Sequence, residues 1–451
     1  MRSLPFLAPL TLALGASLFT ACGGSTDQPN PTSSTTSTTG SGGAGGDATT
    51  TTAASTGGGG AGGDMGPDIG EPSDKYPGPH SPAPKVVNLG GPVLAAPVVV
   101  PVFWSNDQPT IVAQIKDFEE KVGATDYWKA TTKEYGVGVL KAAPAIDLPE
   151  PAPANITDAQ IQAWLADKLN SDDPAFPVAD KNTVYGLHYP KGTIITAGSG
   201  AQTQKSCEVF GGYHSSITLD AAHNDQRVAY MVMPRCANFN GLTGIDVMTA
   251  TESHELIEAA TDPYPQDIPA YGTVDSAHFY WAFVLGGGET ADMCAQWPGA
   301  DTTFPELDYV VQRSWSNKAA SAGHNPCVPV HADSGPYFNA VPVFKDVISL
   351  AGGKIKGLKI PVGESKSIDI QLFSDADTGG PFTVQALTDA DFWGGPKELD
   401  FTWDQDSGQN GQTLHLTVEV LKGNSFNAQF FYLVSTLGQE QNYWIGVVGN
   451  K

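Results

Sequence analysis

The run Val-Val-Val-Pro-Val-Phe-Trp at residues 98–104 constrains the fold of this chain more than any other stretch. Nearly every residue in the run is apolar, which is typical of a strand that is buried on both faces. Pro101 also allows an edge position or a bulge, because proline cannot donate a hydrogen bond to a neighbouring strand. The run therefore predicts a sheet with other layers packed against it.

The sequence around this run interleaves helical and strand patterns. Four apolar residues recur at helical spacing over residues 111–122. A second amphipathic helix is predicted after Thr157, which can form a capping box with Gln160. Short apolar segments bounded by Gly or Pro indicate strands at residues 183–187, 193–196 and 228–233. We therefore predict an α/β domain over residues 85–332.

Beyond His331 the pattern changes to alternating polar and apolar runs separated by Gly, Asp and Asn turns. Examples are residues 366–373, 382–386, 414–420 and 430–434. This pattern predicts a β-sandwich over residues 335–451, so the fold class of the whole chain is α+β. Four aromatic residues of this part could form core or a carbohydrate-stacking face, and core is favoured because sandwich strands need large inward residues: Trp393, Phe401, Trp403 and Trp444.

The N-terminus has the features of an export signal. Arg2 precedes an apolar run to Phe19 that is shorter than the ~20 residues that span a bilayer. Residues 1–21 therefore read as a signal peptide. Ala21 and Cys22 resemble a bacterial lipobox, which implies acylation of Cys22, and Gly23 behind it implies the outer membrane or the cell surface. The alternative is an ordinary cleaved signal that leaves Cys22 unused.

The next stretch lacks the large apolar residues that a folded core needs. From Gly23 to about Gly66 the chain consists mainly of Gly, Ser, Thr and Ala, and a Pro-rich segment follows at 76–84. Such a composition cannot bury enough apolar surface to offset the conformational entropy of the chain. We predict a disordered tether over residues 22–84 that holds the folded part away from a lipid bilayer.

The charge of the chain excludes one class of partner. Asp and Glu number 48 against 24 Lys and Arg, which gives a formal net charge of −24. This excess of negative charge repels a phosphate backbone, so we expect no binding to nucleic acid.

A predicted helix between Gly244 and Pro263 carries the most informative polar pattern. His254 and Glu258 are four residues apart, so on a helix both point the same way and could reach one metal ion. Glu255 then stands where a general base would deprotonate a metal-bound water. This His-Glu-x-x-Glu pattern has a carboxylate where the zincin pattern has its second histidine, and alone it also fits an exposed polar helix face.

Other residues could complete the ligand set. Glu289 and Asp292 follow three consecutive glycines, where a loop could bring a carboxylate to the metal, and we prefer Glu289 with Asp292 as the alternative. Asp262 is within helical reach of Glu258, although the helix dipole disfavours a carboxylate at this end. His214 is a weaker candidate, since a histidine in a Gly-flanked loop is more often a structural residue.

The remaining histidines show no spacing that pairs them with another ligand. His278 lies beside three aromatic residues and is predicted to pack in a wall of the cleft. Ser215 and Ser216 lack the Gly-x-Ser-x-Gly elbow of many hydrolases, which disfavours a serine nucleophile. Five histidines are predicted at the surface or in loops: His188, His223, His324, His331 and His415.

Several segments together resemble one known family. They are Asp126-Tyr-Trp-Lys129 with Glu134-Tyr-Gly136, Cys207 with Gly211-Gly-Tyr-His214, Ala229-Tyr230 to Cys236, Ser253 to Pro263, and Glu289-Thr-Ala-Asp-Met-Cys294. In order and spacing they are similar to the phosphate-induced/EXORDIUM-like family and its bacterial secreted relatives, over about residues 90–330. The resemblance implies an extracellular protein with a zincin-like, metalloprotease-like site in residues 85–332. Thr290 departs from the family, whose members more often have an aliphatic residue there.

The cysteines indicate disulfides. If Cys22 is lipidated, four cysteines remain, and three pairings are compatible with the sequence. Proximity along the chain favours Cys207 with Cys236 and Cys294 with Cys327. A zinc site built from cysteines is the alternative, which the absence of a Cys-x-x-Cys pair disfavours.

These observations converge on one function and two alternatives. The first hypothesis is a zinc peptidase in which His254, Glu258 and a downstream carboxylate hold Zn²⁺, or another divalent metal, and Glu255 activates water for attack on a peptide or protein substrate. The second is a surface binding or adhesion protein whose metal only stabilises the fold. The third is carbohydrate binding by residues 335–451.

Overall fold

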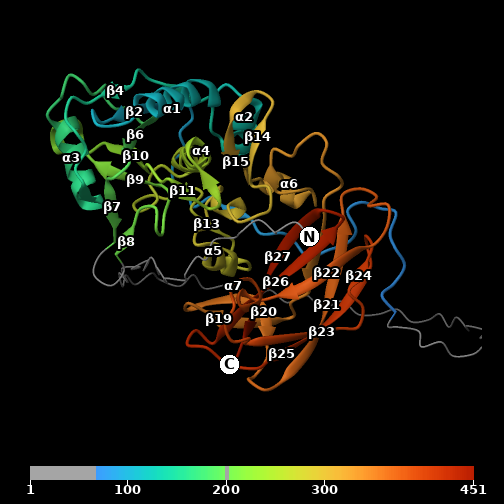
Figure 1. Ribbon diagram of the computed structural model, residues 1–451. Coiled ribbons are helices and arrows are strands. Elements are labelled where there is room, and N and C mark those ends of the chain that lie inside the picture. The colour runs from blue at the N-terminus through green and yellow to red at the C-terminus, as the bar shows by residue number, and fades with distance from the viewer. Residues whose placement is uncertain (1–67, 199–202, 451) are drawn as a thin grey trace, which may run out of the picture. The chain divides into compact units, whose positions relative to one another are not determined.

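The computed structural model describes residues 68–198 and 203–450. The predicted signal peptide, Cys22 and most of the predicted tether lie outside these residues. Among the helices of the described residues, none is both long and apolar enough to cross a membrane. The fold is mixed α and β with mostly strands, in agreement with the predicted class (Figure 1).

A six-stranded sheet forms the centre of the N-terminal half. Its strands run in the order β3, β2, β6, β10 and β9, with β4 also paired to β2. All pairs are parallel except the last, in which β9 runs antiparallel to β10 at the edge. The bounds are β2 (Val98–Phe103), β3 (Lys141–Ala142), β4 (Ile146–Asp147), β6 (Thr183–Tyr189), β9 (Tyr213–Thr218) and β10 (Arg227–Pro234).

Helices cover both faces of this sheet, which explains the continuous apolar run of β2. Val99 and Phe103 belong to the apolar cluster that also includes residues of α1, α2 and α4. Val100 and Val102 belong to the cluster on the opposite face, with residues of α3. Figure 1 shows α3 apart from α1 and α4, on the other side of the strands. The helices are α1 (Pro109–Val122), α2 (Asp126–Thr132), α3 (Asp158–Asn170) and α4 (Ile245–Thr261).

Pro101 lies inside the sheet, at a gap between two neighbours of β2. On that side β2 pairs with β3 at Val98 and Val99, and with β4 at Val102 and Phe103. The missing N–H of proline therefore falls where the neighbouring strand is interrupted.

The chain between α4 and the C-terminal half consists of short elements. They are β13 (Thr273–Val274), α5 (Phe279–Leu285), η4 (Asp292–Cys294), β14 (Asp301–Phe304), β15 (Leu307–Gln312), β16 (Ser314–Trp315), α6 (Asn317–Ser321) and β17 (Cys327–Val328). Strand β15 packs along α4, so that this connection lies against the helix that carries the His-Glu-x-x-Glu pattern. The other short elements are β1 (Val86–Val87), η1 (Lys133–Tyr135), β5 (Asn155–Thr157), β7 (Ile194–Ala197), β8 (Gln204–Lys205), η3 (Ala221–His223), β11 (Asn238–Phe239) and β12 (Leu242–Thr243).

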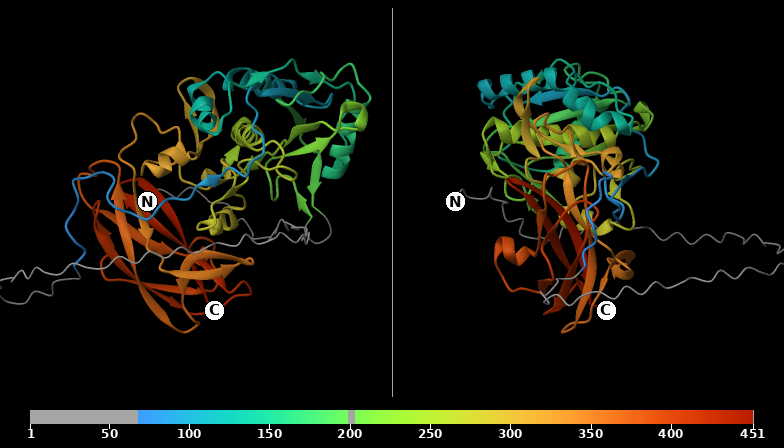
Figure 2. Two further views of the ribbon diagram at one scale, coloured as in Figure 1. Left: turned by 180° about the vertical axis from the view of Figure 1, so that it is seen from behind. Right: turned by 90° about the vertical axis from the view of Figure 1, so that its right-hand side faces the viewer.

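Two antiparallel-rich sheets form the C-terminal half, as the alternating pattern predicts (Figure 2). The first has the order β18 (Phe338–Pro342), β21 (Ser365–Ser374), β25 (Thr413–Val420) and β23 (Leu399–Trp403). The second has the order β19 (Asp346–Leu350), β20 (Gly353–Lys359), β27 (Glu440–Gly449), β26 (Ala428–Leu437), β22 (Phe382–Leu387) and β24 (Ser407–Gly408), and α7 (Asp389–Trp393) follows β22. Their inward side chains make one apolar core.

The chain packs against this sandwich well before residue 85, which differs from the predicted end of the tether. Ile69 accepts a backbone hydrogen bond from Thr413, and Ser73 donates one to Asn410. His80, within the predicted tether, stacks on Phe373 with 3.8 Å between ring centroids. Sequence composition missed this segment because its contacts are mostly backbone hydrogen bonds, which leave little trace in residue type.

The two halves share an apolar core. Trp281 of α5 is fully buried, and its ring centroid lies 5.4 Å from that of Trp444 on β27. The same cluster continues through Trp315 and Phe338 into the sandwich. Trp444 therefore belongs to the core, as predicted, whereas Trp393 is 41% exposed.

Candidate metal centre

Helix α4 brings the predicted residues together inside the protein. His254 and Glu258 lie one turn apart, with 3.1 Å between His254 Nε2 and Glu258 Oε2. Glu255 and Glu258 are buried, although both are charged residue types that normally face water. The predicted helix is therefore present, and its polar side chains are not an exposed face.

Glu258 is held at both of its oxygens. Oε1 accepts hydrogen bonds from the backbone N–H groups of Ala291, at 3.2 Å, and Asp292, at 3.0 Å. Oε2 is left to face the histidines. Burial works to raise the pKa of Glu258, but the neighbouring His254 and the hydrogen bonds outweigh it and lower the pKa to about 2. Glu258 is thus an oriented, ionised carboxylate.

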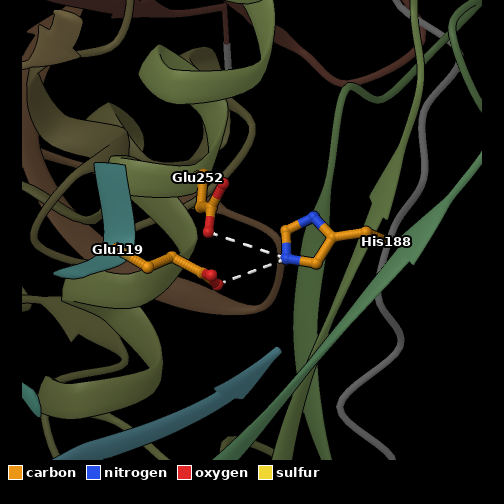
Figure 3. A group of neighbouring side chains, drawn as sticks. All are labelled: Glu119, His188 and Glu252. Carbon is orange, nitrogen blue, oxygen red and sulfur yellow. Dashed lines mark hydrogen bonds and ion pairs between the residues drawn. The ribbon is translucent and has the colours of Figure 1, made fainter. Parts of the chain in front are cut away.

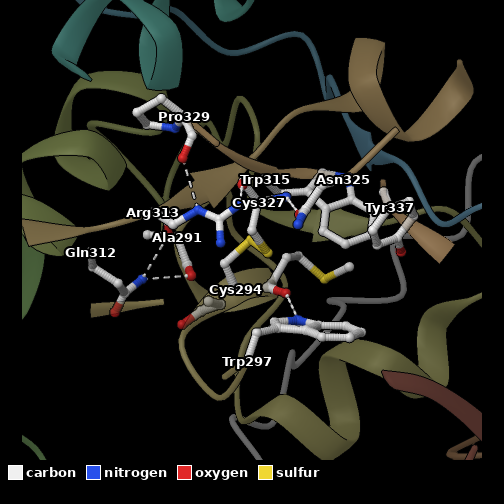
Figure 4. The surroundings of a disulfide bond; sticks show 12 residues. Ala291, Cys294, Trp297, Gln312, Arg313, Trp315, Asn325, Cys327, Pro329 and Tyr337 are labelled. Atoms are coloured by element: carbon white, nitrogen blue, oxygen red, sulfur yellow. Dashed lines mark hydrogen bonds between the residues drawn. A yellow bond between two sulfur atoms is a disulfide. The ribbon is translucent and has the colours of Figure 1, made fainter. Parts of the chain in front are cut away.

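A glutamine orients the ring of His254. The amide nitrogen of Gln312, at the end of β15, donates to the backbone oxygen of Ala291, so its Oε1 must face His254 (Figure 4). His254 Nδ1 lies 3.0 Å from that oxygen and therefore donates its proton to it. In the neutral ring that a metal needs, the lone pair is then on Nε2, which is the atom that faces Glu258 and Asp292. Burial works to lower the pKa of His254, but the charge of Glu258 outweighs it and raises the pKa well above its usual value.

His214 approaches from the antiparallel edge strand β9. Its Nε2 lies 3.2 Å from the backbone oxygen of Asp262, an acceptor, so Nε2 carries a proton, and in the neutral ring the lone pair is on Nδ1. Nδ1 lies 3.5 Å from Glu255 Oε2 and 3.8 Å from Glu258 Oε2. His214, the weaker candidate of the sequence, therefore points a free ligand atom at the same carboxylate as His254.

The loop behind the three glycines supplies two more carboxylates. Asp292 Oδ1 lies 3.6 Å from His254 Nε2, and Asp292 groups with His254 and Glu258 as potential ligands of one ion. Glu289 lies on the other side, with Oε1 3.7 Å from His214 Nε2. The predicted alternative, Asp292, is thus nearer to the His254 and Glu258 pair than the preferred Glu289.

The loop is fixed by close packing and by a disulfide. A Cβ atom on Gly287 would lie 1.7 Å from Asp292 Oδ2, so only glycine leaves room for this carboxylate. A Cβ atom on Gly212, the residue before β9, would lie 3.1 Å from Glu255 Cγ. Cys294, at the end of η4, is bonded to Cys327, which confirms the predicted pairing together with Cys207–Cys236 (Figure 4).

The charges of the site call for a cation. Among the described residues, no Lys or Arg side chain forms an ion pair with the carboxylates of Glu255, Glu258, Glu289 or Asp292. Burial and the charge of Glu258 raise the pKa of Asp292 to about 7 and that of Glu289 well above its usual value. A divalent cation would remove this repulsion, because it adds two positive charges among the carboxylates.

The separations between ligand atoms suit a small ion. Four ligands at zinc's bond lengths stand about 3.3 Å from one another in a tetrahedron. The three closest pairs are 3.1 Å for His254 and Glu258, 3.5 Å for His214 and Glu255, and 3.6 Å for His254 and Asp292. The donor set of imidazole and carboxylate is one that Zn²⁺ accepts.

The remaining predicted residues have structural places. Asp262 lies at the end of α4, where its Oδ1 accepts a hydrogen bond from the backbone of Ala270. His278 pairs with Asp275 at 2.9 Å. His188, predicted at the surface or in a loop, is instead fully buried in the central strand β6. The prediction was wrong because its partners come from distant segments and not from a local spacing.

Comparison with known proteins gives no family for this chain. No family model matches the sequence, and no curated protein matches it. Among solved structures, the surface layer protein SbsC, domains 1–6, is 12% identical over 24% of this chain and 13% of its own, with a TM-score of 0.16. The titin M3 domain is 12% identical over 24% of this chain and 94% of its own, with a TM-score of 0.15. This chain therefore spans only a small part of the first of these structures.

Proposed function

We propose that this protein is a zinc-dependent peptidase with its active site at the amino-terminal half of the fold. One observation carries the proposal: the ligand atoms of His254, Glu258 and Asp292 lie within 4.8 Å of one another, and Glu255 lies next to His254 on the same helix. The sequence resemblance to the EXORDIUM-like family and its bacterial relatives supports the same reading.

The arrangement of elements around the site also supports a zincin-like domain. The helix with the His-Glu-x-x-Glu pattern packs beside a mostly parallel sheet, and the antiparallel edge strand β9 borders the site. His214 on this strand lies against Glu255 and Glu258.

Three side chains would hold the metal in this proposal, His254, Glu258 and Asp292, and the fourth position would stay open to water. His214 groups instead with Glu255 and Glu258. Bound there, Zn²⁺ would supply a Lewis acid and lower the pKa of a water molecule. Gln312 accepts from Nδ1 of His254 and so keeps Nε2 available, and the backbone N–H groups of Ala291 and Asp292 hold Oε1 of Glu258. Asp292 and His254 retain 21% and 15% side-chain exposure, so substrate and water would approach from their side.

Glu255 is the base in this mechanism. It is 7% exposed at its side chain, and its Oε2 lies 3.5 Å from His214 Nδ1. The carboxylate would take a proton from the attacking water and pass it to the leaving amine. The neighbouring His214 also lies 3.8 Å from Oε2 of the proposed ligand Glu258.

The proposed location is the bacterial outer membrane or cell surface, with Cys22 acylated and the Gly/Ser/Thr-rich segment as a tether. Two disulfides support export, because such bonds form and persist in oxidising compartments.

A second candidate is a non-catalytic surface protein in which the metal only stabilises the fold. The position of Glu255 favours it, because Oε2 is as close to His214 as a ligand would be. Glu255 would then fill the position that a peptidase leaves open to water.

Metal content together with peptide cleavage distinguishes the two functions. In a peptidase, His254→Ala should lose metal. Glu255→Gln should keep metal, and its rate of cleavage of a peptide library should fall by about 10²-fold or more. Asp246→Asn, in the first turn of the same helix, serves as the control and should change neither property. Wild type that holds metal and cleaves nothing favours the surface protein, and a Glu255→Gln variant as fast as wild type excludes Glu255 as the base.

A further inference from the structure

A second group of buried ionisable side chains lies between the sheet and two helices (Figure 3). His188 is on β6, Glu119 is on α1 and Glu252 is on α4. His188 Nε2 lies 3.3 Å from Glu119 Oε1 and 3.7 Å from Glu252 Oε1, and all three side chains are 0% exposed. The three residues come from three separate elements and meet at one nitrogen.

This group has far fewer hydrogen bonds than its burial requires. Glu252 has no hydrogen bond at either carboxylate oxygen among the described residues, and Glu119 Oε2 has none. An ionised carboxylate without a partner is among the costliest groups to bury, at several kcal/mol. Two such side chains face each other here. Burial raises the pKa of Glu252 to about 8 and the pKa of Glu119 well above its usual value, so these carboxyls retain a proton unless a cation takes its place.

The neighbouring basic residue does not provide that partner. Arg235 is paired with Asp107, and its Nε and Nη1 have no hydrogen bond among the described residues. Burial, followed by the charge of Arg235, lowers the pKa of His188 to about 3, so the imidazole is neutral. A neutral imidazole with its proton on Nδ1 has its lone pair on Nε2, the atom that faces both glutamates, and can donate it to a metal.

The spacing of the three ligand atoms fits a metal ion. Ligands of a tetrahedral zinc ion stand about 3.3 Å apart, close to the two separations at His188 Nε2. Gly186, two residues before His188 on the same face of β6, keeps this space open. A Cβ atom there would lie 3.3 Å from His188 Nε2 and 2.8 Å from the methyl group of Met231.

We propose that Glu119, His188 and Glu252 form a second, structural binding site for a divalent transition-metal cation. A divalent cation neutralises two carboxylates, and the second oxygen of Glu252 can complete a closed coordination shell without water. The bound ion joins α1, β6 and α4, and α4 also carries the first centre. This site does not depend on peptidase activity.

Zinc stoichiometry tests the site directly. The full chain is loaded with Zn²⁺, desalted and analysed by inductively coupled plasma mass spectrometry. We expect about two zinc ions per wild-type chain and about one in Glu119→Gln or Glu252→Gln, which keep side-chain volume. Glu120→Gln is the matched control, because it changes the exposed neighbour of Glu119 on α1, and it should retain both ions.

Variants of the first centre separate the two proposals. His254→Ala should hold one ion, and the double variant with Glu252→Gln should hold none. In His254→Ala, Zn²⁺ should raise the thermal unfolding midpoint, since only the folded state has the buried site, and it should not do so in the double variant.

Three results decide the question. If wild type holds one ion and both Gln variants keep it, the buried carboxyls share protons and hold no metal. If wild type holds one ion that Glu252→Gln loses and His254→Ala keeps, the result supports the buried site and counts against the proposed peptidase centre. No ion in wild type overturns both sites. Glu119 and Glu252 lie on different helices, so a folding defect in one variant leaves the other as a test.

Discussion

At the scale of single residues, the candidate centre depends on side chains that the chain leaves no room to move. Gly287 is the sharpest case, because a methyl group at this position would overlap the carboxylate of Asp292. The backbone of Asp292 also donates to Glu258. A change at Gly287 therefore reaches two proposed ligands without altering either of them.

We predict that Gly287→Ala displaces Asp292 and weakens zinc binding by about 10-fold or more, as for the loss of a residue that positions a ligand. Competition with a fluorescent chelator measures the affinity. Gly380→Ala is the control, because a Cβ atom there meets nothing within 4 Å. Equal affinity in the two variants would mean that Asp292 takes no part in metal binding.

Part of the site follows from local spacing, and the rest does not. His254 and Glu258 share a helix face, so their approach is dictated by the period of the helix. Gln312 is separated from His254 by 58 positions and meets it only because β15 packs along α4. No local pattern marks such a residue, and the same holds for His188 and its two glutamates.

At the scale of elements, capping and periodicity predict much of the chain. The capping box of Thr157 and Gln160 is present at the start of α3, with both reciprocal hydrogen bonds. Helix α4 runs from Ile245 to Thr261, inside the predicted limits. Strand β9 was not predicted, because most of its residues are polar and half-buried, and an edge strand with one covered face has a weak pattern.

We predict that Thr157→Ala lowers the free energy of unfolding by about 1 kcal/mol, because it removes the hydroxyl that accepts from the backbone of Gln160. Urea unfolding followed by circular dichroism measures the change. Thr157→Ser keeps the hydroxyl and should lose much less. A Ser variant as unstable as the Ala variant would point to the lost methyl group instead.

At the scale of the whole molecule, the two halves predicted as separate domains are joined by buried tryptophans. Trp281 contacts Trp315 and Trp297 on one side and Trp444 on the other. Segments 69–84 and 338–449 also pair by hydrogen bonds. The pattern of the sequence changes between the halves, but it does not reveal that they share a core, because apolar residues look alike whichever half they pack against.

We predict that residues 68–450 unfold in one cooperative step, and that Trp444→Ala lowers the stability of both halves by about 3–5 kcal/mol. Differential scanning calorimetry shows whether one transition occurs, and zinc retention reports on the amino-terminal half. Trp393→Ala, on a side chain that is 41% exposed, is the control. Two separate transitions, with only one shifted by Trp444→Ala, would mean that the halves fold independently.

The Cys294–Cys327 disulfide affects when the candidate centre can bind its metal. It closes residues 294–327, which include Gln312, and it anchors the chain two residues after Asp292; both residues contact His254 or Glu258. Such a bond forms after a chain has left a reducing cytoplasm. In the exported protein that we propose, maturation of the centre would follow secretion, and the supply of ions outside the cell would decide which metal the newly folded chain acquires.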